Sequence, residues 1–149
     1  MGYQPIIVTP QDRPESLKIV GEEIAVLASG AETGSYEIFL QSGPEGAGPP
    51  PHNHPWDEAF FVLQGEVAFS VSDQEQLARP GTLVQVPAGT THWFRIAADG
   101  TQMLSMTSRS GAAALFTQLD AEVAPVDPDL GKLIEIATAH GLTMMAPPA

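Results

Sequence analysis

The feature that most limits the fold of this chain is a series of short β-type segments separated by Gly, Pro and Asp. These segments occupy 18–29, 35–41, 59–64, 66–72, 82–87, 91–96 and 102–108. Many short strands with turn residues at such intervals are typical of antiparallel sheets and not of alternating strands and helices. The sequence therefore predicts an all-β sandwich or barrel.

The end of the chain has a different pattern. From Gly111 onward, 112–119 is a short helical run, and 127–141 has apolar residues at helical spacing, namely Leu130, Leu133, Ile134 and Ala137. Asp127 or Asp129 can cap the start of the second helix, and Gly141 suits its end. We expect one domain, 1–149, with a barrel over roughly 16–110 and a short C-terminal helical tail over 111–149.

Charge and composition exclude several classes of partner. Eighteen acidic and six basic residues give a net charge of −12, which repels nucleic acid and anionic membranes. We find no apolar run of membrane-spanning length and no signal-like N-terminus, so we expect a cytoplasmic protein. Because the chain has no cysteine, any metal must be held by His and carboxylate side chains. The scattered basic residues favour a neutral or weakly acidic small-molecule substrate over a phosphorylated one.

Three of the four histidines and one glutamate fall into two blocks, 46–65 and 81–93. His52 and His54 are two residues apart, so on an extended strand both imidazoles leave the same face and can reach one ion. The bend at Pro55 can return Glu58 to that face, and His92 must come from a neighbouring strand. The fourth histidine, His140, stands at the end of the second helix, where capping explains it better than metal binding.

These two blocks resemble the motifs of the cupin superfamily. Matching positions in the first motif are Gly46, His52, His54, Glu58 and Gly65, and those in the second are Gly81, Pro87, Gly89 and His92. Ile96 stands where the second motif usually has Asn, a position that does not bind the metal. The resemblance implies a double-stranded β-helix, or jelly-roll barrel, with one metal ion bound by His52, His54, Glu58 and His92 near an open end.

Three imidazoles and a carboxylate suit a divalent transition metal, namely Fe, Mn, Ni, Co, Cu or Zn, and the sequence does not choose among them. On an octahedral ion these ligands leave two positions open for water, substrate or dioxygen, as catalysis requires. Glu58 is the candidate catalytic base, because a carboxylate ligand can also accept the proton of a bound substrate hydroxyl.

Strand alternation predicts which other residues line the pocket. Phe60 and Val62 share the face of Glu58, Phe94 shares that of His92, and Arg95 points away from the metal. We also expect Tyr36, Met103 and Met106 beside the cavity, although the parity of their strands is open. The expected pocket is apolar and aromatic, with Glu58 as its one inward ionisable group apart from the histidines.

An open metal site in an apolar pocket favours oxygen chemistry on an aromatic or enolic compound. The residues 49–67, 86–95 and the helical tail resemble small bacterial cupins grouped with quercetin 2,3-dioxygenases, which implies a flavonol as the candidate substrate and dioxygen as co-substrate. A metal-dependent isomerase, lyase or decarboxylase and a non-catalytic small-molecule binding protein stay open as alternatives. We expect a homodimer formed through sheet edges or the N-terminal arm.

Overall fold

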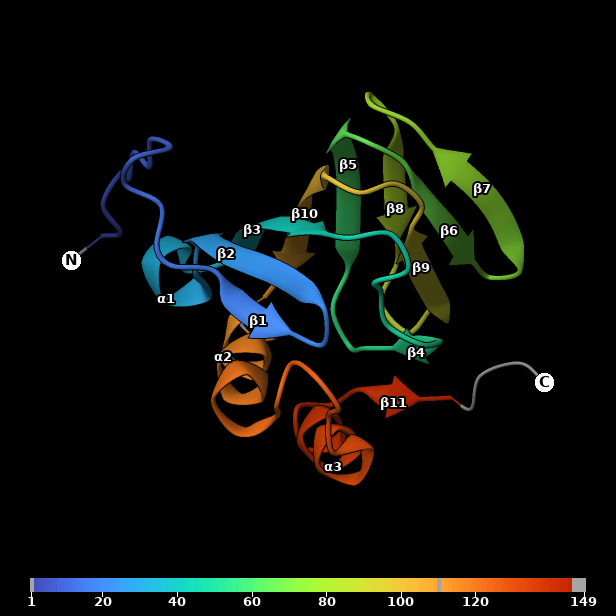
Figure 1. Cartoon of the computed structure of the whole chain (residues 1–149). Helices are drawn as coiled ribbons and strands as arrows, with labels where there is room; N and C mark the ends of the chain where they lie inside the picture. Colours follow the sequence, from blue (N-terminus) through green and yellow to red (C-terminus); the bar gives the residue numbers. More distant parts are fainter. Residues whose placement is uncertain (1, 110, 146–149) are drawn as a thin grey trace.

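The computed structural model describes residues 2–109 and 111–145, which form two antiparallel sheets and three helices (Figure 1). The larger sheet contains β1 (Leu17–Ile19), β2 (Glu22–Ala28), β3 (Tyr36–Gly43), β10 (Thr101–Ser108), β5 (Glu58–Gln64) and β8 (Leu83–Val86), in that order. The smaller contains β11 (Thr143–Met144), β4 (His52–Asn53), β9 (His92–Ile96), β6 (Val67–Val71) and β7 (Gln74–Ala78). Successive strands often change sheet, as β4 and β5 do, which gives a jelly-roll barrel. The all-β prediction is confirmed.

Several elements differ from the sequence prediction, and the single predicted segment 18–29 is in fact the antiparallel pair β1 and β2. The segment at 30–34, between the first two predicted β-type segments, contains the single-turn helix α1 (Gly30–Thr33), whose first turn is closed by a capping box between Ser29 and Glu32. Strand β7 was not predicted, because its residues Gln74–Ala78 are mostly polar and exposed. Strand β11 was hidden in the predicted helical tail, where two residues carry too little pattern to be recognised.

The tail contains helices α2 (Ala112–Glu122) and α3 (Leu130–Ala139) and returns to the smaller sheet through β11. Asp129 caps α3 by accepting a hydrogen bond from the amide of Lys132 at 3.0 Å, and Gly141 has a φ of 93° just beyond its end. Figure 1 shows both helices at one end of the strands, with α2 beside β1 and α3 beside β11. Among the described residues, no helix has the length and apolarity needed to cross a membrane.

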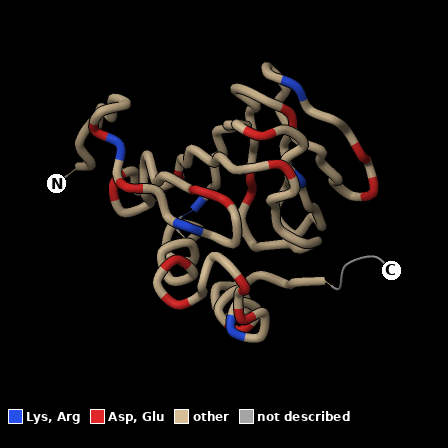
Figure 2. Tube along the Cα trace, in the orientation of Figure 1, with Lys and Arg blue, Asp and Glu red and all other residues tan. Residues whose placement is uncertain are grey.

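The buried apolar side chains form two clusters. The first lies between the β2–β3 side of the larger sheet and the two C-terminal helices, and it contains Ile24, Phe39, Trp56, Leu115 and Ile136 among others. The second fills the space between β5, β8, β9 and β6, and includes Phe60, Val62, Phe69, Phe94 and Met103. Figure 2 shows that acidic residues are spread over both sheets and the helices, whereas the few basic residues are scattered singly.

Candidate metal centre

The three histidines of the two motifs meet at the end of the barrel that faces the helices. His52 on β4 lies directly opposite His92 on β9 in the strand register, so both rings leave the same face of the smaller sheet. His54 lies just beyond β4 and not on it, so the predicted strand pair is only partly correct. All three are buried, and one ring nitrogen from each lies within 4.8 Å of the others. This group could hold a metal ion.

The backbone selects which nitrogen of each histidine faces this point. The Nδ1 atoms lie 2.9 Å from three carbonyl oxygens, those of Pro50 for His52, of Trp56 for His54 and of Thr90 for His92. A carbonyl only accepts hydrogen bonds, so each Nδ1 carries the proton and each neutral ring presents the lone pair of Nε2. The Nε2 of His92 is buried without a hydrogen-bond partner among the described residues. Such a set of lone pairs can bind a cation.

Glu58 begins β5 and reaches the same point from the opposite sheet. Its Oε1 lies 3.1 Å from His54 Nε2 and 3.4 Å from His92 Nε2. Ligand atoms bound at about 2.1 Å to a shared ion are separated by roughly 3.0–3.4 Å, so these contacts fit a common coordination shell. The chemistry of the donor set, nitrogen and carboxylate oxygen, suits a transition metal.

Burial and neighbouring groups set the charges at the centre. Burial, and then the nearby His92, lower the pKa of His52 to about 4, so the ring is neutral at pH 7. Burial alone would raise the pKa of Glu58, but the close approach of the His54 and His92 rings outweighs it and brings the pKa to about 2. Glu58 is therefore ionised. Neutral imidazoles and an ionised carboxylate are the forms in which these residues bind metals.

The residues predicted to line the pocket do not all face the interior. Phe60, Val62, Phe94 and Met103 are buried in the second apolar cluster. The prediction that Tyr36 and Met106 line the pocket is wrong. Their side chains are 44% and 49% exposed and lie on the outer face of the larger sheet. On β10 the buried positions are Thr101, Met103, Ser105 and Thr107, so alternation turns Met106 outward.

The interior of the barrel is more polar than we expected from the sequence. Among the described residues, seven further buried residues carry polar side chains, two of them acidic: Glu22, Glu37, Gln41, Ser70, Thr101, Ser105 and Thr107. The expectation that Glu58 is the one inward ionisable group apart from the histidines is therefore wrong. Strand alternation puts Glu37 and Gln41 on the same face as Phe39, and Ser105 and Thr107 on the same face as Met103, but it does not say which face is inward.

Two other predicted placements concern charged groups outside the centre. The Arg95 guanidinium donates hydrogen bonds to the carbonyls of Pro49 and Phe94 at 2.6 and 2.8 Å. It also lies 5.7 Å from the Trp93 ring centre, so its side chain lies on the outer face of β9. His140 caps the end of α3, and its Nε2 lies 2.7 Å from Gln118 Oε1. Neither belongs to the three-histidine group.

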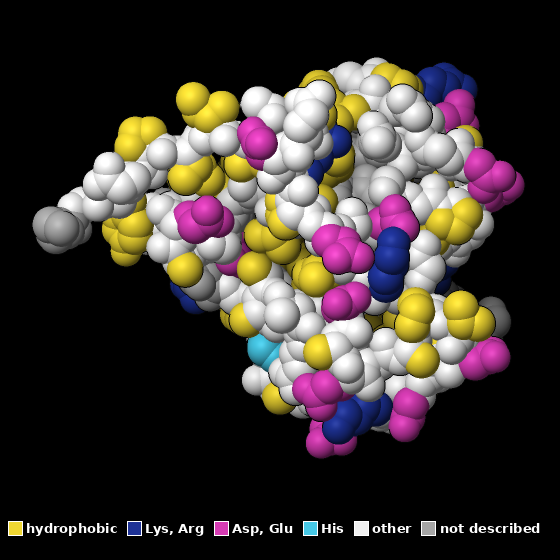
Figure 3. All heavy atoms as spheres, turned by 60° about the vertical axis from the view of Figure 1, so that its left-hand side comes forward, with side chains coloured by type: hydrophobic (Ala, Val, Ile, Leu, Met, Phe, Trp, Pro, Cys, Tyr) yellow, Lys and Arg dark blue, Asp and Glu magenta, His cyan; other side chains and the backbone are white. Residues whose placement is uncertain are grey.

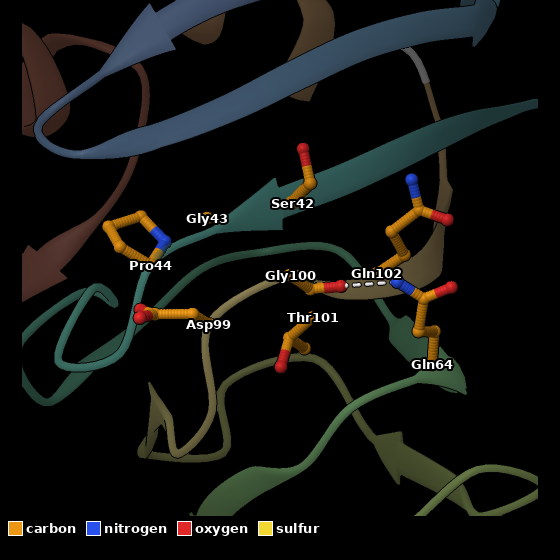
Figure 4. Close-up of a pocket in the computed structure, with 8 residues that line it drawn as sticks. All are labelled: Ser42, Gly43, Pro44, Gln64, Asp99, Gly100, Thr101 and Gln102. Atoms are coloured by element: carbon orange, nitrogen blue, oxygen red, sulfur yellow. Dashed lines mark hydrogen bonds between the residues drawn. The ribbon is translucent and has the colours of Figure 1, made fainter.

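A surface hollow of about 500 Å³ lies at the opposite end of β10, around Thr101 and Gln102. Figure 4 shows that the side-chain amide of Gln64 donates a hydrogen bond to the Gly100 carbonyl, with an N–O distance of 2.7 Å. Most of the residues that line the hollow are small or polar. Thr101 is six residues from Thr107, which pairs with Glu58, so this hollow is roughly 20 Å along the strand from the histidines. It is not part of the metal centre.

The model of the family described as "Cupin domain" matches residues 39–107, a range that contains all four candidate ligands. The chain belongs to the cupin superfamily. The solved structure of KdgF from Halomonas sp. has a similar fold, with a TM-score of 0.65, 17% identity and coverage of 70% of this cupin and 94% of that chain.

Two curated relatives are dioxygenases by name. Quercetin 2,3-dioxygenase of Bacillus subtilis (strain 168) is 32% identical over 102 residues, which cover 66% of this cupin and 30% of the relative. Acireductone dioxygenase of Parasynechococcus marenigrum (strain WH8102) is 40% identical over 47 residues, which cover 29% of this cupin and 25% of the relative. The matches thus span less than a third of the length of either relative.

Proposed function

We propose that this cupin is a metal-dependent dioxygenase that acts on an aromatic or enolic small molecule, with a flavonol as the candidate substrate. The observation that carries the metal site is the convergence of three Nε2 lone pairs and one carboxylate on a single point, with every Nδ1 held by a backbone carbonyl. Similarity to two proteins named as dioxygenases supports the reaction class.

In this proposal His52, His54, Glu58 and His92 hold one divalent transition metal, which would supply Lewis acidity and access to oxygen chemistry. Glu58 has a second role, as the base that accepts the proton of a substrate hydroxyl. The imidazoles are held in orientation by the carbonyls of Pro50, Trp56 and Thr90, so they need no rearrangement to bind.

A second candidate function is favoured by one specific observation. Glu22 is a buried carboxyl on the interior face, and burial followed by the charge of Glu58 raises its pKa to about 8. A carboxyl that is protonated at neutral pH can act as a general acid. Such a group suits a metal-dependent isomerase or lyase that uses no oxygen, so the test of function must measure oxygen directly.

The metal site is tested by elemental analysis of the purified protein and of two variants. His92→Ala removes a proposed ligand and should lose stoichiometric metal, whereas His140→Ala removes the one histidine outside the group and should keep it. Metal retained in full by His92→Ala would overturn the ligand assignment.

The reaction is tested by oxygen uptake with a flavonol panel, using protein loaded in turn with Fe, Mn, Ni, Co, Cu and Zn. Metal-dependent uptake that is lost in Glu58→Gln at unchanged protein fold would support the dioxygenase. Metal-dependent conversion of a substrate without oxygen consumption would support the isomerase or lyase instead.

We also propose that the cupin forms a homodimer through the outer face of the larger sheet. Strands β3, β10, β5 and β8 place no charged residue at an outward position, in a chain of eighteen acidic and six basic residues. Five apolar side chains on this face are exposed, namely Tyr36, Phe61, Leu63, Leu83 and Met106. An uncharged apolar face of a strongly acidic protein fits a second copy better than it fits a charged partner.

The N-terminal arm over 2–16 adds exposed apolar side chains at Tyr3, Ile6, Ile7 and Val8. Figure 3 shows apolar side chains along this arm, which reaches away from the body of the molecule.

Light scattering of two matched variants tests the dimer. Phe61 on the larger sheet and Leu77 on the smaller sheet are each 41% exposed in the wild type. Phe61→Lys should give a monomer and Leu77→Lys should not.

A further inference from the structure

A line of polar side chains lies between the two apolar clusters. Strand β10 runs between β3, which contributes to the first cluster, and β5, which contributes to the second. The inward residues of β10 beyond Met103 are Ser105 and Thr107, and Gln41 on β3 lies opposite Met103. Hydroxyl and amide groups thus occupy the place where the two clusters would otherwise join.

Three atoms of this line have no hydrogen-bond partner among the described residues: Gln41 Oε1, Ser105 Oγ and Thr107 Oγ1. Their residues are 4%, 1% and 1% exposed. A buried polar group without a partner costs about 1–3 kcal/mol, so most such groups in native proteins are paired with protein, water or a ligand. Three of them on two adjacent strands are available to bind a ligand.

The strand register places this line against the metal centre. Thr107 lies opposite Glu58, Ser105 lies opposite Phe60, and Met103 lies opposite Val62. Side chains of directly opposed residues are neighbours, about 5 Å apart at Cβ. The line therefore starts beside the proposed ligand Glu58 and extends along β10 for roughly 13 Å, the length of four residues.

The charges around the line select the chemistry of a ligand. The amide nitrogen of Gln41 donates to Glu22 Oε1 at 3.2 Å, which leaves the amide oxygen free as an acceptor. Apart from the three candidate metal-binding histidines, the buried ionisable groups nearby are the acids Glu22, Glu37 and Glu58, and no Lys or Arg side chain is buried. A carboxylate or phosphate would find no buried Lys or Arg here, whereas a neutral hydroxyl can donate to Gln41 and exchange hydrogen bonds with Ser105 and Thr107.

We propose that Gln41, Ser105 and Thr107 are specificity-determining residues that bind the hydroxyl groups of a neutral polyhydroxylated aromatic substrate while its reacting end is held at the metal centre. This inference rests on the proposed function for the position of the reacting end. It adds the substrate class: polyphenols with several hydroxyl groups are accepted, and carboxylated analogues are rejected.

The test uses metal-loaded protein under nitrogen, so that binding is measured without turnover. Quercetin, which carries hydroxyls on both benzene rings, is compared with 3-hydroxyflavone, which has only the 3-hydroxyl of the heterocycle, and catechol is compared with benzoate. Thr107→Val removes the free hydroxyl at nearly constant volume, and Thr107→Ser restores it. We expect Thr107→Val to weaken quercetin binding about 3- to 10-fold, the effect of one neutral hydrogen bond, to leave 3-hydroxyflavone unchanged, and to recover with Thr107→Ser.

Thr101 provides a matched control on the same strand. It is also 1% exposed and inward, but its hydroxyl donates to the carbonyl of Ala98 at 2.7 Å. Thr101→Val should lower the melting temperature of the ligand-free protein and leave quercetin binding unchanged. Thr107→Val should melt at or above the wild-type temperature, because its hydroxyl has no protein partner to lose.

Each outcome bears on the inference separately from the proposed function. Quercetin affinity that is equal in wild type and Thr107→Val overturns the inference, and so does wild-type protein that binds neither quercetin nor catechol or prefers benzoate. If quercetin binding depends on Thr107 but the protein takes up no oxygen, the inferred binding role of the polar side chains is supported and the proposed dioxygenase activity is contradicted. Ser105→Ala should repeat the pattern of Thr107→Val.

Discussion

The indole of Trp56 stacks on the imidazole of His54, with ring centres 4.7 Å apart and planes inclined by 11°. The Trp56 carbonyl also faces His54 Nδ1 at 2.9 Å, so one residue fixes both the tautomer and the ring plane of a candidate ligand. Trp56 belongs to the apolar cluster that includes Leu115 of α2 and Ile136 of α3. The helical tail is therefore packed against the support of the metal centre.

Trp56→Ala should lower both stability and metal affinity. Loss of a buried indole costs about 3–5 kcal/mol in the free energy of unfolding, and loss of an outer support of a ligand weakens metal binding about 10-fold. Urea denaturation and competition with a chelator measure the two effects. Trp93 stands next to another candidate ligand but on the outer face, so Trp93→Ala should leave metal affinity unchanged; equal losses in the two variants would contradict the role of Trp56.

The candidate metal ligands could be recognised in the sequence because their spacing is local: His52, His54 and Glu58 lie within seven residues, and His92 follows a short Pro-x-Gly turn. The polar interior was not predicted, because the parity of β3 and β10 decides whether Gln41 and Thr107 or Leu40 and Met106 face inward. Both faces of these strands contain apolar residues, so hydrophobic alternation alone did not choose. Packing of the helices against Phe39 settles the choice in the folded protein.

Glu37 joins three elements through its buried carboxylate. Its Oε2 accepts from the Gly30 amide at the start of α1, and its Oε1 accepts from the amides of Gly111 and Ala113 at the start of α2. Helix α2 has no side-chain cap of its own, so Glu37 takes the place of one from a distant strand.

Glu37→Gln should therefore destabilise the protein by about 2–4 kcal/mol, because hydrogen bonds to a charged acceptor are replaced by weaker ones and the new amide donors lack partners. Hydrogen exchange should quicken in the first turn of α2 more than in α3. Asp120→Asn is the control, since Asp120 is exposed and accepts from one backbone amide, that of Lys18. A uniform increase in exchange over both helices would mean that Glu37 does not act as the cap.

Gly65 connects β5 to β6 with a φ of 80°, and a Cβ at this position would lie 2.7 Å from the backbone Cα of Thr101. Gly89 has a similar φ of 79°, but a Cβ there would meet no atom within 4 Å. Gly89→Ala should cost about 1–2 kcal/mol, the strain of a left-handed alanine. Gly65→Ala should cost more, because β10 must also move. Chemical denaturation of the two variants separates strain from collision, and equal losses would show that the contact with Thr101 is relieved without cost.

The raised pKa of Glu22 predicts how stability changes with pH in metal-free protein. Burial, and then the charge of Glu58, raise this pKa from 4.5 to about 8, whereas Gln41 and Arg95 lower it by smaller amounts. Between these values the unfolded chain has released the proton and the folded chain still holds it, so the free energy of unfolding falls as the pH rises from about 4.5 to 8.

Glu22→Gln removes this titration and keeps the shape of the side chain. The variant should match the wild type near pH 4 and exceed it above pH 8 by on the order of 2–5 kcal/mol, measured by urea denaturation in the presence of EDTA. Glu23→Gln changes the neighbouring exposed carboxylate, which pairs with Lys18, and should keep the wild-type slope. A wild-type profile that is flat between pH 5 and 8 would mean that Glu22 is ionised inside the barrel, where it would act as a base and not as the proton donor of an isomerase or lyase.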